Sequence, residues 1–292
     1  MISVIIPNHN NSNFLLECLG SILICKEVRQ IIVVDDASTD NSVTLIKNIQ
    51  KEHPPIELIT STHPKPMGAA YCRNLGLQGA REKYISFLDS DDVFEEGRFK
   101  TSLALLESDP SIDGVYDNVG SWNETLDNRR PDFDIKMPLD IASEDLFEHL
   151  LFDGQTFISI IGIILRKDVA KAYQMDESLA IGEDSDYLWK LALHHRLVHS
   201  GDEGSKIKRR MHGDNITRNT HLWDQSRSQL FHKWYTYAQD VGLDEKVVIY
   251  FFRKAIHYSA KEKAGLGLAY KFWAYFKLTL KHPLWWQYHS ST

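Results

Sequence analysis

Residues 30–36, Gln-Ile-Ile-Val-Val-Asp-Asp, combine four consecutive branched apolar residues with two acids at their end. Isoleucine and valine favour strands, and an uninterrupted apolar run is typical of a strand that is buried on both faces of a parallel sheet. Further predicted strands cover residues 3–7, 56–60 and 84–88. The sequence therefore predicts several buried strands, one of which ends in Asp35 and Asp36.

Helix-like segments separate these strands. The predicted helices cover residues 11–23, 42–50, 68–80 and 98–106. Strands that alternate with helices predict an α/β fold with a Rossmann-like, mostly parallel sheet and helices on both faces. After Ile112 the pattern is less regular. There we expect strands at 115–116, 158–165 and 206–211 and a helix at 183–197.

The composition is that of a folded globular protein. Of the 292 residues 43% are hydrophobic and 25% are charged, which excludes a disordered or collagen-like chain. The net charge of −7 argues against nucleic-acid binding, since a surface that follows phosphates needs an excess of Lys and Arg. Cys18, Cys25 and Cys72 have no CxxC spacing, and the N-terminal segment lacks the basic and long apolar parts of a signal peptide. We therefore expect reduced thiols, no zinc site and a cytoplasmic protein.

Acidic residues follow two of the predicted strands. Asp35 and Asp36 end one strand, and Asp89, Asp91 and Asp92 follow another. Ligands of open α/β sheets bind beyond the carboxyl ends of the strands. A carboxylate there can accept a hydrogen bond from a nucleobase, and two together suit a hard cation that is shared with substrate phosphates. The alternative interpretation is structural, with a helix cap after Asp36 and a solvated turn at 89–92.

A further acidic pair, Glu183 and Asp184, follows Gly182 at the predicted start of a helix. The helix macrodipole stabilises a carboxylate at that position. Such a carboxylate suits a general base, which must lie within hydrogen-bond distance of the hydroxyl that it deprotonates. Helix capping is the structural alternative.

Five segments, in this order, resemble glycosyltransferase family 2, whose members have the GT-A fold and use nucleotide-diphospho-sugars. The segments are Ser-Val-Ile-Ile-Pro-Asn-His-Asn (3–10), Val-Val-Asp-Asp-Ala-Ser-Thr-Asp-Asn-Ser (33–42), Gly-Ala-Ala-Tyr-Cys-Arg-Asn-Leu-Gly (68–76), Phe-Leu-Asp-Ser-Asp-Asp (87–92) and Gly-Glu-Asp-Ser-Asp-Tyr (182–187). The resemblance covers about residues 1–220. We expect a nucleotide-sugar-binding half over 1–115, an acceptor-binding half of the same GT-A domain over 116–220, and a helical extension over 221–292.

The resemblance implies residues for the donor site. Pro7, His9 and Asp36 are expected to line the base pocket, with Asp36 on the ring N–H of a pyrimidine. Family members usually have Tyr where His9 stands, so guanosine and thymidine stay open although uridine is favoured. Arg73 and Asn74 match an Arg-Asn pair that lies near the nucleotide in the family. Arg73 is expected at the diphosphate, and a salt bridge on the helix surface is the alternative.

The resemblance also implies a divalent cation, Mn²⁺ or Mg²⁺. Asp89 and Asp91 match the Asp-x-Asp motif of the family, in which Asp91 is the better candidate for direct metal contact and Asp89 lies beside the nucleotide. His212 matches a histidine that follows the last sheet strand and can reach the metal or the diphosphate. The alternative for His212 is a loop histidine without a ligand.

Asp184 matches the general base of the family. One base without a nucleophile implies inverting transfer of a sugar from a nucleotide-diphosphate donor, with UDP-sugars favoured, to a hydroxyl of a glycan or lipid-linked glycan; a retaining path would need Glu183 or Asp186 as a nucleophile. Two other functions compete with this one. A catalytically silent nucleotide-binding or scaffold module has no use for a base. A sugar-nucleotide nucleotidyltransferase needs a Gly-rich, basic loop where residues 8–12 stand, and these include neither Gly nor a basic residue.

The C-terminal segment differs in composition from the rest of the chain. Residues 251–282 include seven Lys and Arg against one Glu, and aromatic residues are frequent over 270–288. Basic residues beside aromatic ones suit a helix that lies on the inner face of the cytoplasmic membrane, here through residues 266–286. Lysines interrupt every apolar stretch that approaches the length of a membrane span. Packing on the catalytic domain, or on a second subunit of an oligomer, is the alternative.

Overall fold

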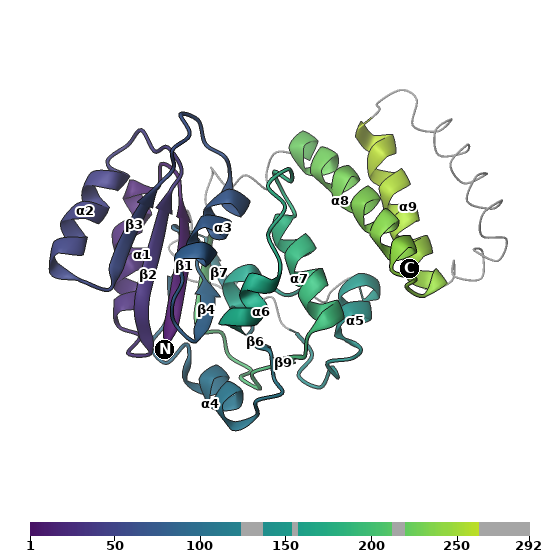
Figure 1. The fold of residues 1–292 in the computed structure, drawn as a ribbon, viewed down its shortest axis with the longest axis horizontal. Coiled ribbons are helices and arrows are strands. Elements are labelled where there is room, and N and C mark those ends of the chain that lie inside the picture. Colours follow the sequence, from purple (N-terminus) through teal and green to yellow (C-terminus); the bar gives the residue numbers. More distant parts are fainter. Residues whose placement is uncertain (124–136, 154–156, 212–219, 263–292) are drawn as a thin grey trace. The chain divides into compact units, whose positions relative to one another are not determined.

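The computed structural model describes residues 1–123, 137–153, 157–211 and 220–262. The chain divides into two compact units. One consists of Met1–Glu177 and Asp184–Gly213, and the other consists of Ser178–Glu183 and Asp214–Thr292. The first unit contains the sheets, and the second contains a pair of long C-terminal helices (Figure 1).

The first unit is built on a seven-stranded sheet (Figure 1). From one edge to the other its strands are β3 (Ile56–Thr60), β2 (Val28–Asp35), β1 (Ile2–Asn8), β4 (Tyr84–Phe87), β8 (Ile163–Arg166), β6 (Gly114–Tyr116) and β9 (Leu197–His199). β8 is antiparallel to both of its neighbours, and all other neighbouring strands are parallel. The carboxyl ends of every strand except β8 therefore lie at one edge of the sheet. The prediction of a mostly parallel α/β sheet is confirmed.

Helices cover both faces of this sheet, as predicted (Figure 1). One face carries α1 (Ser12–Leu23) and α2 (Ser42–Glu52), and the other carries α3 (Ala69–Gly79) and α6 (Lys167–Ala172). α1 buries Leu15, Leu19 and Ile22, which recur at the spacing of one helical face. The first unit also contains α4 (Lys100–Ser108), α5 (Leu146–Phe152) and α7 (Glu183–His194).

A smaller sheet completes the first unit. Its three strands are, in order, β5 (Val93–Phe94), β10 (Ile207–Met211) and β7 (Gly120–Asn123). β10 is antiparallel to β5 and parallel to β7. The sheet therefore joins the segment after β4 to a strand more than 110 residues further along the chain.

The second unit contains the helical hairpin of α8 (Thr220–Asp240) and α9 (Glu245–Glu262). Gly242 turns the chain between them with a φ of 71°, and the Asp244 carboxylate accepts a hydrogen bond from the Lys246 N–H at the start of α9. Trp234 stacks on Phe251 across the helices at a ring-centroid distance of 5.3 Å. The expected C-terminal helices are thus present. In the described part of the chain, no helix combines the length and apolar character needed to cross a membrane.

Two predicted elements have different boundaries in the structure. The expected strand 158–165 begins as the 3-10 helix η1 (Ile160–Gly162) and becomes a strand only at β8. The main-chain carbonyl of Gly162 instead accepts the N–H of Asp117 at 3.0 Å. The helix expected over 183–197 ends at His194, because Leu197–His199 pair with β6 as β9. In both cases pairing with a distant segment overrides the local pattern.

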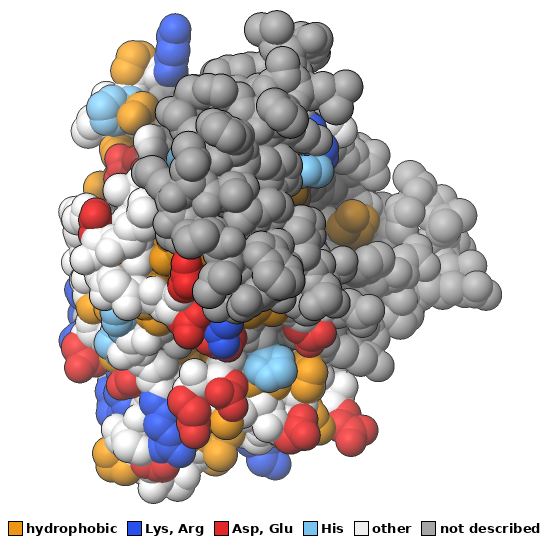
Figure 2. Space-filling view, turned by 90° about the vertical axis from the view of Figure 1, so that its right-hand side faces the viewer, with side chains coloured by type: hydrophobic (Ala, Val, Ile, Leu, Met, Phe, Trp, Pro, Cys, Tyr) orange, Lys and Arg blue, Asp and Glu red, His pale blue; other side chains and the backbone are white. Residues whose placement is uncertain are grey.

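Exposed charges of the first unit are largely mixed in sign. Lys83 pairs with Glu107 at 2.8 Å and Arg196 with Asp109 at 2.7 Å. On the face drawn in Figure 2, the coloured acidic and basic side chains likewise lie beside one another. Such pairs in water contribute about 0–1 kcal/mol each, so they add little to the stability of the fold.

α3 lies unusually close to the sheet at one position. A Cβ atom on Gly76 would fall well inside van der Waals contact with Cγ2 of Ile5 on β1. A Cβ atom on Gly79, one turn further along the same helix, would lie 3.5 Å from the nearest atom of Ile59, which is an ordinary contact. Only the first glycine is therefore required by packing.

We predict that Gly76→Ala lowers the free energy of unfolding by about 1–3 kcal/mol, because the added methyl group overpacks the contact with β1. Gly79→Ala is the matched control on the same helix, and it should leave the stability unchanged or raise it by up to about 1 kcal/mol. Urea denaturation of the two variants measures the difference. Equal effects of both substitutions would contradict the close approach of α3 to β1.

Candidate functional site

The ends of β1 and β2 are joined by polar side chains. Asn8 and Asp35 are register partners at the carboxyl ends of the two strands, and the Asn8 amide donates a hydrogen bond to the Asp35 carboxylate at 2.8 Å. The other oxygen of Asp35 accepts the N–H of Ser38 at 3.1 Å. Asp35 is buried, so these bonds offset the cost of removing its charge from water. Asp35 thus holds the loop after β2 in place.

Asp36 is buried directly beyond the end of β2. Its carboxylate accepts the main-chain N–H groups of Met67, at 2.8 and 2.9 Å to its two oxygens, and of Gly68 at 2.7 Å. Gly68 precedes α3 and has a φ of 98°, a conformation that side chains other than hydrogen disfavour. Asp36 therefore binds the N-terminus of α3, where unpaired N–H groups gather. Its expected contact with a nucleobase stays a prediction.

His9 and Pro7 lie beside Asp36. The ring Nδ1 of His9 is 2.6 Å from the Asp36 carbonyl oxygen, so Nδ1 carries the proton, and Nε2 accepts the Asn10 amide at 3.0 Å. His9 is exposed and Pro7 is half-buried. Both are accessible to a ligand at this edge of the sheet.

The helix cap that competes with a ligand role for this loop is made by Asp40. Its carboxylate accepts the N–H groups of Ser12 and Ser42, the first residues of α1 and α2, at 2.9 Å each. Burial acts to raise the pKa of Asp40, but the hydrogen bonds from Ser42 and Ser12 outweigh it and lower the pKa to about 2. Asp36 and Asp40 thus have separate tasks within one loop.

Arg73 and Asn74 are neighbours on α3 with different partners. The buried Arg73 guanidinium pairs with the Asp89 carboxylate at 2.7 Å. The Asn74 amide exchanges two hydrogen bonds with the main chain of Met175, at 2.9 and 3.0 Å, and donates to Glu177 at 2.8 Å. Asn74 thus ties α3 to the segment before α7. The nucleotide contacts expected of both residues stay predictions.

Residues 89–92, directly after β4, alternate in exposure. Asp89 and Asp91 are half-buried, whereas Ser90 and Asp92 are buried. The Asp92 carboxylate accepts the N–H of Arg210 at 2.7 Å. Burial raises the pKa of Asp92 well above its usual range, and the charges of Asp91 and Asp89 raise it further. The loop therefore concentrates negative charge, with Asp89 and Asp91 on its accessible side.

Arg210 of β10 holds this loop, a role that the sequence did not reveal. Its Nε donates to the Asp91 carbonyl oxygen at 2.8 Å, and its guanidinium pairs with Glu17 and lies 4.9 Å from the centre of the Phe14 ring. The Arg210 side chain is 5% exposed, whereas that of Glu17 is 58% exposed. Arg210 thus connects the Asp89–Asp92 loop to α1. The available signal was the run of three basic residues at 208–210 on a predicted strand, because successive strand residues point to opposite sides and both sides therefore carry a basic residue.

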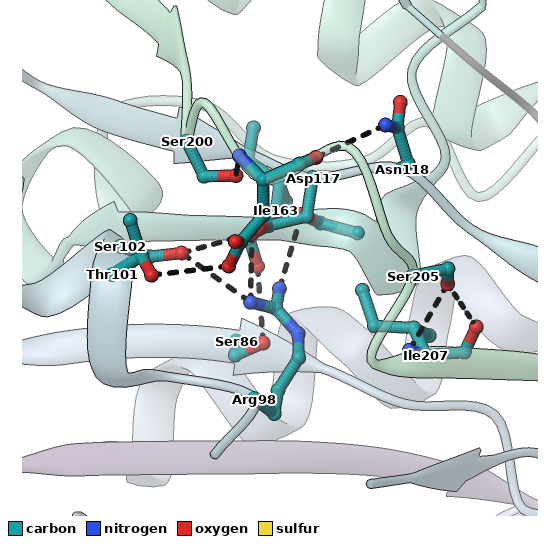
Figure 3. Close-up of polar contacts among 12 residues, drawn as sticks. Ser86, Arg98, Thr101, Ser102, Asp117, Asn118, Ile163, Ser200, Ser205 and Ile207 are labelled. Carbon is teal, nitrogen blue, oxygen red and sulfur yellow. Dashed lines mark hydrogen bonds and ion pairs between the residues drawn. The ribbon is translucent and has the colours of Figure 1, made fainter.

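A second buried arginine lies near the end of β6 (Figure 3). Arg98 pairs with Asp117 at 2.7 Å and donates to the Gly162 carbonyl at 3.1 Å, and the Ser102 hydroxyl also donates to Asp117. The side chains of Arg98 and Asp117 are 0% and 8% exposed. This pair fastens the start of α4 to β6 and η1, and it too is absent from the sequence-based prediction.

The residues at the sheet edge fit a divalent cation that is shared with a ligand. Asp89 and Asp91 offer carboxylate oxygens, and Mg²⁺ commonly binds through one or two carboxylates plus substrate phosphates. Within residues 1–123, 137–153, 157–211 and 220–262, no three His, Cys, Asp or Glu side chains form a metal-binding group by themselves. His212 follows β10 directly and lies outside the described residues. The fit therefore depends on Asp89, Asp91 and the oxygens of a ligand.

Asp184 is the second residue of α7 and is half-buried. It accepts the N–H of Ser185 at 2.6 Å, whereas Asp186 is fully buried and pairs with Lys190 at 2.8 Å. Tyr187, in the next turn, contacts Phe87 of β4 edge to face with ring centroids 6.2 Å apart. This contact joins the second turn of α7 to the strand that leads into Asp89.

Comparison with known proteins finds similar sequences. The sequence model described as Glycosyl transferase family 2 matches residues 3–173. The minor teichoic acid biosynthesis protein GgaB of Bacillus subtilis is 32% identical over 193 residues, which are 63% of this chain and 20% of GgaB. The chain spans about a fifth of the length of the first curated relatives that it matches.

Two solved structures share the fold. S. aureus TarS 1–349 in complex with UDP-GlcNAc has a TM-score of 0.63 at 17% identity, over 91% of this chain and 75% of that one. The mannosyltransferase PcManGT from Pyrobaculum calidifontis, in complex with GDP-Man and Mn²⁺, has a TM-score of 0.57 at 16% identity, over 97% of this chain and 81% of that one. The arrangement of strands and helices is therefore that of GT-A glycosyltransferases, with the C-terminal helices added.

We predict that Arg210→Met lowers the free energy of unfolding by about 1–3 kcal/mol, because it removes the hydrogen bond to the Asp91 carbonyl oxygen and the ion pair with Glu17. Lys208→Met is the matched control on the same strand. Lys208 lies 3.9 Å from Glu95 in a largely solvated pair, and its loss should cost no more than about 1 kcal/mol. Urea denaturation compares the variants, and equal losses would mean that Arg210 does not hold the loop.

Proposed function

The chain belongs to glycosyl transferase family 2, and from this we propose that it transfers a sugar from a nucleotide-diphosphate donor to a hydroxyl of a glycan or a lipid-linked glycan. The observation that supports this most directly is the Phe87–Tyr187 contact, which joins β4, the strand before the acidic loop, to α7 one turn after Asp184. A loop suited to a diphosphate and its cation and a carboxylate suited to a base thus belong to one compact unit.

The donor is proposed to lie along the carboxyl edge of the main sheet. Pro7 and His9 line the base pocket in this proposal, and Asp36 accepts a ring N–H with the lone pairs that Met67 and Gly68 leave available. A uridine nucleotide is favoured, since TarS was solved with UDP-GlcNAc. PcManGT was solved with GDP-Man, which keeps guanosine as the alternative.

The diphosphate is proposed to reach Asp89, Asp91 and α3. Asp91 and Asp89 would hold Mn²⁺ or Mg²⁺ together with the diphosphate oxygens, with His212 as a further ligand. A bound cation neutralises the charge that develops on the departing nucleoside diphosphate. Arg73, which pairs with Asp89, adds a positive charge beside that leaving group, and Asn74 keeps α3 in register with the segment before α7.

Asp184 is proposed as the general base. It accepts the proton of the acceptor hydroxyl as the oxygen attacks the anomeric carbon from the face opposite the nucleotide, so the configuration inverts. Asp186 does not suit a nucleophile, because it is fully buried and paired with Lys190. The half-buried Asp184, two residues earlier on the same helix, suits contact with an acceptor.

The division of labour along the chain is proposed as follows. Residues 1–115 bind the nucleotide-sugar, 116–220 contribute the acceptor side, and 221–292 form the helical extension. We propose a cytoplasmic location, with residues 266–286 in contact with the inner face of the membrane or with a second subunit. These residues lie outside the described part of the chain.

Replacement of Asp184 by Asn tests the base. We predict that Asp184→Asn lowers kcat for sugar transfer by about 10²–10⁴-fold while donor binding stays within about twofold, because the amide cannot accept the hydroxyl proton. Asp168→Asn is the matched control, since Asp168 occupies the same second position of α6 and is exposed. If Asp184→Asn turned over at the wild-type rate, Asp184 would not be the general base. If the unmodified protein bound the donor but showed no turnover, a silent binding module would be favoured.

A thermal-shift screen tests the donor and the cation. We predict that UDP with Mn²⁺ at about 100 times its Kd raises Tm by about 5 °C or more, and that EDTA or Asp91→Asn abolishes the shift. GDP and dTDP with Mn²⁺ are measured in parallel. A larger Tm shift with GDP or dTDP would assign a different nucleobase to the donor. An equal Tm shift by UDP in the presence of EDTA would refute the proposed role of the metal in donor binding.

A further inference from the structure

One face of the helical hairpin in the second unit combines basic and aromatic side chains. Arg227 and Phe231 lie one turn apart on α8, and Tyr250, Lys254 and Tyr258 lie one turn apart on α9. The Phe231 ring contacts both tyrosines, with centroids 5.4 Å from Tyr258 and 6.3 Å from Tyr250. Phe231 is 4% exposed and packs between the helices, and the half-buried Arg227, Tyr250, Lys254 and Tyr258 complete a set of five residues that we term the Arg227–Lys254 face.

Both cations of this face are in contact with aromatic rings. The Arg227 guanidinium lies 4.5 Å from the centre of the Trp223 ring, and the Lys254 ammonium lies 5.4 Å from the centre of the Tyr250 ring. Both cations are half-buried, so part of each remains open to a ligand. The rings restrict the two side chains and shield one side of each charge from water.

In the described part of the chain, neither Arg227 nor Lys254 forms an ion pair with a carboxylate. The Nε atom of Arg227 is buried without a hydrogen-bond partner. Lys261, two turns along α9 from Lys254, differs in this respect, because it lies 3.6 Å from Asp224. Lys254 lies between the two tyrosines that contact Phe231, and Arg227 lies one turn before Phe231. Asp224, the described acid one turn before Arg227, pairs with Lys261 instead.

The electrostatics of Lys254 agree with this imbalance. Burial lowers its pKa, and the charges of Arg253 and Arg227 lower it further. Arg227 also acts to lower the pKa of Tyr250, although burial raises that pKa to about 12 overall. Positive charge is thus crowded here, and an anion bound between the cations would stabilise both.

We propose that the Arg227–Lys254 face binds a phosphate group. A guanidinium presents two parallel N–H donors that match two oxygens of a phosphate, and an ammonium adds a compact charge beside it. A carboxylate ligand offers less charge for two cations to share than a phosphate. The proposal does not depend on the sugar-transfer function, since none of these residues belongs to the sheet edge of the first unit.

The phosphate can come from a soluble ester or from a lipid headgroup, and both sources share this chemistry. Aromatic residues beside cations occur at membrane interfaces as well as at anion sites. The experiment therefore uses inorganic phosphate as one probe and vesicles of phosphatidylglycerol, with phosphatidylcholine vesicles as reference, as the other.

Isothermal titration calorimetry of the full chain with inorganic phosphate measures binding of a soluble phosphate. EDTA is included to keep cations from the acidic loop. Arg227→Gln and Lys254→Gln are each expected to weaken phosphate binding about tenfold. Lys261→Gln is the matched control with the same loss of charge on the same hairpin, and it should leave the affinity within about twofold. Arg227→Lys should restore part of the binding, and thermal unfolding verifies that each variant folds.

Vesicle sedimentation measures binding to a lipid headgroup. Binding to phosphatidylglycerol vesicles that falls in Arg227→Gln and Lys254→Gln but not in Lys261→Gln would support the proposal and identify the source as a lipid. Binding of inorganic phosphate with the same dependence would support a soluble source. The proposal is overturned if neither probe binds, or if the three Gln variants lose binding equally, since that would reflect net charge alone.

Discussion

Negative charge collected at the carboxyl edge of the main sheet is the constraint on which the surrounding structure depends. Asp35, Asp36 and Asp92 are buried there, and a buried carboxylate without partners would cost several kcal/mol. Main-chain N–H groups meet this need, from Ser38 for Asp35, from Met67 and Gly68 for Asp36 and from Arg210 for Asp92. These hydrogen bonds hold the loop after β2 against the start of α3 and the loop after β4 against β10.

The loop after β4 separates structural and chemical roles by alternation. Ser90 accepts the Asn11 amide at 2.7 Å and Asp92 binds the Arg210 N–H, so the inward residues build the loop. Asp89 and Asp91 lie on the outward side, where a ligand can reach them. Residues 89–92 form a turn in which the Asp92 N–H donates to the Asp89 carbonyl oxygen at 3.0 Å, and this turn leaves both Asp89 and Asp91 half-buried. Arg73 then offsets the charge of Asp89.

The sheet and its edge were predictable because their signals are local. Branched apolar runs such as residues 30–35 specify buried strands, and acids at the ends of parallel strands must meet at one edge. The roles of Arg98 and Arg210, and the contact of Asn74 with Met175, were not predicted, because they depend on partners far along the chain. Arg210 meets Asp92 across 118 residues and Asn74 meets Met175 across 101. A single sequence carries no record of such pairs.

The two proposed phosphate sites differ in the sign of their own charge. In the proposed function the acidic edge of the first unit repels a diphosphate unless a cation accompanies it, so the proposed recognition there depends on Mn²⁺ or Mg²⁺. The Arg227–Lys254 face needs no such cation, because its own side chains supply the positive charge. Chelation and salt therefore act on the two units differently. A chelator removes the attraction at the edge, whereas salt screens the attraction at the hairpin. The different responses to chelator and to salt therefore distinguish the two proposed sites, even if the same phosphate ligand binds to both.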